Sequence, residues 1–332
     1  MNLDNCKYVV WGYKNVYHTH THIHEAFYRT LKLTGKTVEW LDAADDIRDK
    51  DFSNTFFISN SDCINNSYWP WKTPIISSIP LRTDCFYAIH GLNNDAAVSD
   101  ILRPFKNKLS WNVLTTETWT KNIIPPWFPA PEGRIDLDVE APFWPKEGNL
   151  QFRWATDLIP SEIEANKPKE MLSLKNKVVH YIGTLWWVNE KELAEFRRAC
   201  IDDGVEFKQT GAGQDGVISH EDNIRMVRES YMAPSISGTH HLTEGYAPCR
   251  IFKNISYGQF GITNSKYVNE LFENRLIYNP DPYQLYFDAK ERLQNMHVSE
   301  LHELMDFVAA KHTYLNRLDI LKKAAQIIID NG

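Results

Sequence analysis

The chain contains a run of alternating histidines, HTHTHIHE, between His18 and Glu25. A third of its 12 histidines lie in this short run. Histidine titrates near neutral pH and is the most common metal ligand, so such a run can supply a general base or bind a metal ion. The third interpretation is a polar helix face without a chemical role.

A second stretch with chemical potential, EGYAPCRIFKNISYG, begins at Glu244. Pro248 suits the start of a helix, because its missing N–H is not needed there. Arg250, Lys253 and Asn254 then fall in or near the first turn. Unpaired N–H groups and the helix dipole attract anions, so this turn suits a diphosphate, and Glu244 could contact sugar or ribose hydroxyls. The alternative is an ordinary amphipathic helix with solvated charges.

The composition argues against several classes of protein. The net charge of -7 does not favour nucleic acid, which binds basic surfaces. The five cysteines form no CxxC pair, so we expect neither a disulfide framework nor a zinc knuckle, and a cytoplasmic location fits best. The first residues do not resemble a signal peptide, and no apolar stretch approaches ~18 residues, so no membrane span is expected.

The elements that must position these residues form two similar series. In the first, 8–13 and 37–42 are predicted strands, and the helical spacing of apolar residues over 23–33 predicts a helix between them. Strand, helix and strand with short joints form a βαβ unit and hence a parallel sheet. Further apolar runs predict more strands of this sheet at 55–59, 74–79, 85–91 and 110–115.

The pattern restarts near Lys177, after a segment rich in proline and aromatic residues at 125–168 that we expect to be irregular. Strand and helix alternate again, with predicted strands at 177–184, 205–211 and 259–265 and predicted helices at 189–204, 221–230 and 249–258. Two amphipathic helices are expected over 298–330.

These two series predict an α/β protein with two Rossmann-like domains that face each other across a cleft. The expected divisions are an N-terminal domain at 1–155, a linker at 156–176, a second domain at 177–312 and a final helix at 313–332 that could pack back on the first domain. Ligands of open α/β sheets bind outside the carboxyl ends of strands. The loops expected to carry the chemistry are therefore 13–22, 183–188, 211–219 and 238–250.

Several residues of the second series could contact a ligand. Gly183 and Thr184 follow a predicted strand, so their backbone could approach a phosphate closely, although a plain tight turn would look the same. Trp186 could stack on a base or sugar, and we assign it to the acceptor, with core packing as the alternative. His240 and His241 precede the second stretch and could hydrogen-bond a donor.

The segment PCRIFKNISYGQFGITNS resembles the donor-site helix of CgeB-like glycosyltransferases and the donor motif of fucosyltransferases. The resemblance covers 244–265 well and most of the chain loosely. It implies a GT-B glycosyltransferase that moves a sugar from a nucleoside-diphosphate sugar to a hydroxyl of a glycan or other acceptor, with no metal or other cofactor required. Arg250 and Asn254 stand at the basic and amide positions, whereas Lys253 replaces a glutamate. The fucosyltransferase-like helix favours a GDP-sugar over a UDP-sugar.

The start of the chain is similar to that of GT-B acceptor domains. In plant-type glucosyltransferases, a loop histidine before the first helix is the catalytic base. Counting back from the glycine that ends the helix places His20 there, with His22 as an alternative base and His24 as an alternative or an acceptor contact. A base must reach the acceptor hydroxyl and needs a suitable pKa. Glu244 is the other catalytic candidate. In a retaining enzyme His20 would bind a substrate instead.

Two other functions are open. HxH after a first strand also opens metal-dependent amidohydrolases, with His180, His220 or His240 as further ligands, although that fold needs eight βα units in one barrel. A non-catalytic sugar- or nucleotide-binding protein would keep the cleft and lack the base. The DLD at Asp136–Asp138 resembles the metal-binding motif of other transferases, but it lies in the proline-rich segment and we treat it as a chance match.

Overall fold

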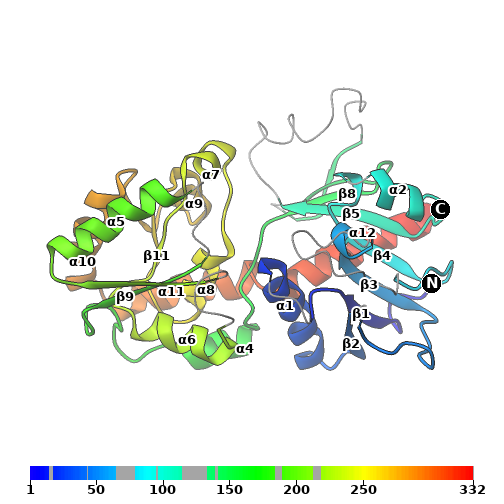
Figure 1. The fold of residues 1–332 in the computed structure, drawn as a ribbon, viewed down its shortest axis with the longest axis horizontal. Coiled ribbons are helices and arrows are strands. Elements are labelled where there is room, and N and C mark those ends of the chain that lie inside the picture. The colour runs from blue at the N-terminus through cyan, green and yellow to red at the C-terminus, as the bar shows by residue number, and fades with distance from the viewer. Residues whose placement is uncertain are drawn as a thin grey trace. The chain divides into compact units, whose positions relative to one another are not determined.

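A computed structural model describes residues 1–14, 18–42, 44–64, 79–94, 96–113, 133–138, 141–183, 189–211 and 218–331. The chain divides into two compact units. The first comprises the described residues of Met1–Leu114, Lys121–Arg153 and Tyr314–Gly332, and the second comprises those of Trp154–Thr313. Each unit contains helices packed on parallel strands, which confirms the predicted α/β class (Figure 1).

The first unit is built on an eight-stranded sheet with the order β2-β1-β3-β4-β5-β8-β7-β6. The strands from β2 to β8 in this order are parallel: β1 Lys7–Trp11, β2 Val38–Leu41, β3 Thr55–Asn60, β4 Phe86–His90, β5 Lys108–Val113 and β8 Asn149–Phe152. Two short antiparallel strands, β7 (Pro142–Trp144) and β6 (Ile135–Asp136), extend the sheet beyond β8. β3 is buried along its whole length, as expected for a central parallel strand.

The helices of the first unit come from distant parts of the chain: α1 Thr19–Leu33, α2 Ala96–Leu102 and α12 Tyr314–Asn331, with short 3-10 turns η1 Ser61–Cys63 and η2 Leu92–Asn94. The C-terminal helix α12, red in Figure 1, packs on α1 and β5. The rings of Phe27 in α1 and Tyr314 in α12 meet edge to face with centroids 4.7 Å apart. The end of the chain is therefore part of the first unit.

The proline-rich segment departs from the expectation of irregular chain. Its described part contains β6, β7 and β8, together with α4 (Pro160–Asn166). The reason is burial, because Phe143, Leu150 and Phe152 all lie in the core. The exposed Asp136 of the DLD sequence lies in the edge strand β6 and pairs with Arg134. The strand expected at 74–79 lies, except for its last residue, outside the described residues.

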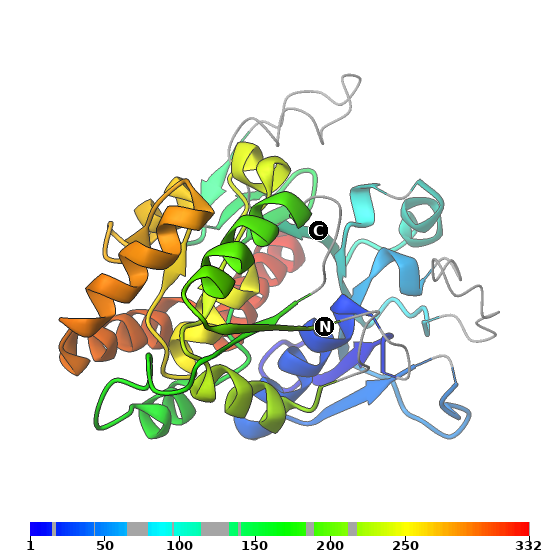
Figure 2. The same cartoon turned by 60° about the vertical axis from the view of Figure 1, so that its left-hand side comes forward.

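The second unit has two small parallel sheets, β10-β9 and β11-β12-β13. The strands are β9 Val178–Ile182, β10 Glu206–Thr210, β11 Pro234–Ser235, β12 Ile262–Thr263 and β13 Ile277–Tyr278. The helices are α5 Glu190–Asp202, α6 His220–Glu229, α7 Thr239–Glu244, α8 Cys249–Ser256, α9 Lys266–Leu271, α10 Pro282–Gln294 and α11 Val298–Lys311. Helices α5 and α10 pack against each other (Figure 2).

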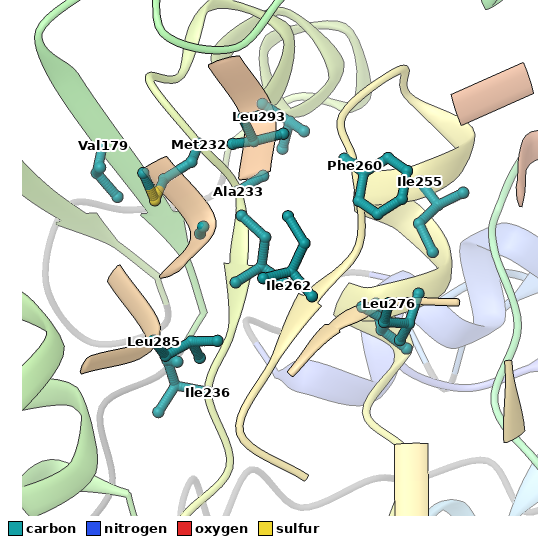
Figure 3. Packing of buried hydrophobic residues seen from close by; sticks show 14 of the residues in the cluster. Val179, Met232, Ala233, Ile236, Ile255, Phe260, Ile262, Leu276, Leu285 and Leu293 are labelled. Carbon is teal, nitrogen blue, oxygen red and sulfur yellow. The ribbon is translucent and has the colours of Figure 1, made fainter. Parts of the chain in front are cut away.

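One hydrophobic core joins these elements of the second unit (Figure 3). Val179 of β9, Ile262 of β12 and Ile255 of α8 point into it, together with Leu285 of α10. Residues 156–176, where we expected a linker, also contribute buried side chains to this core, Leu158 and Ile163. This segment is therefore packed as part of the second unit.

Candidate functional site

The first unit gathers polar side chains at the carboxyl edge of its sheet. β1 is followed by Gly12 and Tyr13, both in left-handed backbone conformations with φ of 94° and 57°. This conformation is unfavourable for a residue with a side chain, so the surroundings must hold Tyr13 in place. The Tyr13 hydroxyl donates to Oδ2 of Asp62, just after β3, at 3.1 Å. Burial, with Cys63 and Asp62 nearby, raises the pKa of Tyr13, so its phenol stays protonated.

Helix α1 begins on this edge with His18 as its N-cap. The His18 Nδ1 accepts from the backbone N–H of His20 at 3.2 Å, and the Thr21 hydroxyl accepts from the His18 N–H at 3.3 Å. These two bonds satisfy helix donors that would otherwise lack partners. The Nδ1 atoms of His18 and His20 lie 3.2 Å apart. Burial and the neighbouring histidines lower the pKa of His20 well below its ordinary value, so its ring is neutral at neutral pH.

His24 is fully buried behind these residues. Its Nδ1 donates to the Gly12 carbonyl at 2.8 Å, which joins α1 to the end of β1. Its Nε2 is buried without a hydrogen-bond partner in the described part of the chain. Burial lowers the pKa of His24 to about 4, so this ring is also neutral.

A fourth histidine, His90, reaches the same place from the end of β4. Its Nδ1 accepts from the Asn60 amide at 3.0 Å, and the Asn60 Oδ1 accepts from the Asp62 N–H at 3.0 Å, which fixes the orientation of the amide. Burial lowers the pKa of His90 to about 3. The ring centroids of His90 and His20 are 5.3 Å apart.

We call His18, His20, His24 and His90 the histidine cluster. His20 and His24 are one helical turn apart and share a face of α1, whereas His22 points elsewhere. The His22 side chain is 43% exposed, and its Nδ1 lies 3.9 Å from a Glu25 carboxylate oxygen. The sequence reasoning missed His90, although its place at the end of a predicted strand was a usable signal.

The buried histidines predict an acid-sensitive fold. The pKa of His24 is about 4 in the folded state against 6.5 for an ordinary histidine, so the unfolded chain binds the proton first. The contribution of His24 to the free energy of unfolding is therefore fully present above about pH 6.5. It is lost as the pH drops towards 4, and this loss is on the order of 3 kcal/mol from His24 alone. Urea unfolding between these pH values checks this.

His24→Gln should have a flatter stability profile than the natural chain, with a residual slope because His90 also titrates below its ordinary pKa. His22→Gln is the matched control on the same helix and should keep the full slope. Equal slopes for the His24 variant and the natural chain would contradict the assignment.

In the second unit, Arg250 lies in the first turn of α8, after the N-cap Pro248. Its Nε donates to the carbonyl of Ile182, the last residue of β9, at 2.8 Å, and its guanidinium carbon lies 4.1 Å from the centre of the Tyr181 ring. A Cβ atom on Gly183 would lie only 1.8 Å from Nη2 of Arg250. Glycine at 183 therefore allows the guanidinium to lie over the end of β9.

This end of β9 is a carboxyl edge, as in the first unit. The Gly183 N–H donates to the carbonyl of Thr210, the last residue of β10, at 2.8 Å. The N-cap residue Pro248 makes no side-chain hydrogen bond to the first N–H groups of α8. The edge thus combines a fixed guanidinium with the N-terminus of a helix. Thr184 and Trp186, predicted for the same loop, lie outside the described residues.

The segment between β11 and α8 supplies further polar groups. His241 in α7 packs on the Tyr246 ring with centroids 4.6 Å apart. Burial, with His240 and Arg250 nearby, lowers the pKa of His241. His240 is exposed. Glu244 ends α7, where Gly245 at φ 65° turns the chain towards α8.

Lys253 and Asn254 bind other parts of the protein. The Lys253 ammonium lies 2.8 Å from Oδ2 of Asp157, and the two side chains are only 12% and 9% exposed. Tyr257 donates to the same carboxylate at 2.7 Å. Burial alone would raise the pKa of Asp157, but Lys253 and then His220 outweigh burial and hold it well below its usual range. The Asn254 amide donates to a backbone carbonyl before β11 at 2.9 Å.

The pair of Asp157 and Lys253 predicts a large loss of stability when one partner is removed. Asp157→Asn leaves a buried ammonium without its counter-charge, which should lower the free energy of unfolding by about 3–5 kcal/mol. Urea unfolding of this variant, of Lys253→Met and of the double variant measures the coupling. The double variant should recover part of the loss. A loss below about 1 kcal/mol for Asp157→Asn would show that the pair is not needed.

Among the residues that the structure describes, no three histidine, cysteine or acidic side chains are arranged to hold a metal ion. His180, His220 and His240, considered as further ligands, lie in the second unit, on β9, α6 and α7. No helix in the described ranges is long and apolar enough to cross a membrane.

The fold and the two edges define an α/β protein of two parallel-sheet units, each with polar side chains gathered where strands end. The chain is similar to the solved structure of trehalose-6-phosphate synthase OtsA, with a TM-score of 0.47, 11% sequence identity and 98% of each chain covered. No family model and no curated protein matches the sequence. Function therefore has to be inferred from the residues at the two edges.

Proposed function

We propose that the chain is a GT-B glycosyltransferase that moves a sugar from a nucleoside-diphosphate sugar to a hydroxyl of a glycan or similar acceptor. The observation that supports this most is Arg250, fixed at the N-terminus of α8 and lying over Gly183 at the end of β9. Helix N–H groups and a guanidinium at a carboxyl edge together suit a diphosphate.

In this proposal the second unit binds the donor. Arg250 offsets the negative charge that develops on the leaving diphosphate, a task that needs no metal ion when a cation is already in place. His241 and Glu244 would contact the donor sugar or ribose, and His240 is a further donor candidate. Lys253 and Asn254 would act indirectly, because their bonds to Asp157 and to a backbone carbonyl hold α8.

The first unit would bind the acceptor. His20 is neutral and partly exposed at a carboxyl edge, so it can take the proton of an attacking hydroxyl. We propose His20, and not His22, as the base, because His22 faces away from the cluster and lies beside Glu25. His24 would support the acceptor site from behind, and Trp186 is a candidate for stacking on the acceptor sugar.

The test is the melting temperature of the natural chain with GDP, UDP, ADP, CMP and TDP, each with and without Mg²⁺ or Mn²⁺, and with Zn²⁺ alone. A ligand that binds only the folded state raises the melting temperature. We expect a rise with one diphosphate without metal, most of all GDP. A rise with Zn²⁺ and with no nucleotide would refute the transferase and favour the hydrolase.

A further inference from the structure

We propose that His18 is a positioning residue, which fixes the ring of His20 in the tautomer with its proton on Nδ1 and thereby leaves Nε2 as the basic nitrogen. The assignment of the tautomer follows from hydrogen bonds alone. Its consequence for catalysis rests on the proposed function, in which His20 is the general base.

The first step concerns His18. Its Nδ1 receives the backbone N–H of His20 at 3.2 Å. A backbone N–H can only donate, so the His18 Nδ1 must be the acceptor and carries no proton. The proton of the neutral His18 ring is therefore on Nε2.

The second step concerns His20. Its Nδ1 lies 3.2 Å from the same His18 Nδ1, and the two ring planes differ by 13°. Two unprotonated nitrogens at this distance would repel each other, so one must donate. Since the His18 Nδ1 is the acceptor, the His20 Nδ1 carries the proton. Tyr13 packs beside both rings, with centroid distances of 4.9 Å and 5.4 Å, and limits their rotation.

The third step gives the chemical consequence. The two nitrogens of a histidine have distinct roles, and the bond made by one sets the role of the other. With its proton on Nδ1, neutral His20 can take a proton only at Nε2. An unconstrained neutral histidine prefers the opposite tautomer, in which Nε2 is a donor and cannot deprotonate a hydroxyl. His18 thus opposes the intrinsic preference of the ring.

The cluster also contains an internal reference. The His24 Nδ1 lies 2.8 Å from the Gly12 carbonyl, which can only accept, so His24 must also carry its proton on Nδ1. Its tautomer does not depend on His18 and should not respond to substitutions there.

The test is nitrogen-15 NMR of the histidine rings in the full chain at neutral pH. His20→Gln identifies the His20 signals. His18→Gly removes the ring acceptor, yet glycine is tolerated at an N-cap, and His18→Asn is the matched variant that keeps an acceptor and a good cap. We expect His20 with Nδ1 protonated in the natural chain and in His18→Asn, and a shift towards protonated Nε2 in His18→Gly, with His24 unchanged in all three.

A His20 ring protonated on Nε2 in the natural chain would overturn the inference, as would an unchanged His20 tautomer in His18→Gly. Kinetics test the positioning role: kcat should fall about ten-fold in His18→Gly with KM unchanged, and His18→Asn should restore it. An unchanged kcat in His18→Gly would overturn that role. The predicted NMR pattern in a chain without transferase activity would support the tautomer and refute the proposed function.

Discussion

Replacing Arg250 with alanine is expected to lower turnover about 100- to 1,000-fold with the fold intact, which is the effect of removing one group that stabilises developing negative charge. The guanidinium is held by the Ile182 carbonyl and the Tyr181 ring, so it is already oriented before a donor binds. Its loss removes the charge and the orientation together. The fold should survive, because a single partly buried hydrogen bond contributes only about 1 kcal/mol.

Steady-state kinetics with the sugar donor of the nucleotide identified by the melting experiment would measure turnover. Calorimetry with the diphosphate itself would measure nucleotide binding. Gly183→Ala is an independent test, because the new methyl group would meet the guanidinium and displace it without removing its charge. Gly183→Ala should therefore weaken nucleotide binding, as Arg250→Ala does. Arg225→Ala, in an exposed ion pair on α6, is the matched control and should change neither turnover nor nucleotide affinity. Near-normal turnover with Arg250→Ala would refute the donor site.

The second large effect is expected for His20→Gln. Loss of a general base lowers turnover by about 100- to 10,000-fold, and here kcat should fall with nucleotide affinity unchanged, because the residue belongs to the other unit. If His20 is the base, the natural chain should lose activity at acidic pH as the base becomes protonated. The midpoint should lie below 6.5, because the pKa of His20 is lowered by burial and by its neighbours.

His22→Gln separates the two candidate bases, since both residues lie in the same helix and only His20 belongs to the cluster. Its kcat should stay close to that of the natural chain. If His22→Gln lost activity and His20→Gln kept it, the register of the site would be wrong. If both kept full activity, the first unit would supply no base, as in a retaining mechanism.

The alternation of strands and helices could be predicted from the sequence because it depends on local apolar spacing. The first strand and the helix at Arg250 appear close to where that spacing places them. The first helix does not, because α1 begins at Thr19 and contains most of the histidine run that we expected in a loop. The α/β class followed from their order. The strands β7 and β8 were missed because their aromatic residues occur among prolines. These side chains are recognised as core residues only when the strands are seen to join the sheet.

The sites were less accessible to sequence reasoning for a different reason. Lys253 looks like an anion ligand within its helix, but its partner Asp157 lies 96 residues earlier in the chain. His20 and His22 are the same residue type two positions apart. Which of their side chains faces the histidine cluster depends on where α1 begins. Tyr13 packs against rings of the histidine cluster from a left-handed backbone conformation, which nothing in its residue type suggests.

The contribution of α12 to the first unit has a consequence for the order of events on the ribosome. Trp154–Thr313 is one continuous stretch, so the second unit can fold as soon as that stretch has emerged. The first unit is synthesised first, yet its core lacks the helix that covers α1 and β5 until residues 314–331 are made. The half of the protein that begins the chain is therefore the half that is completed last.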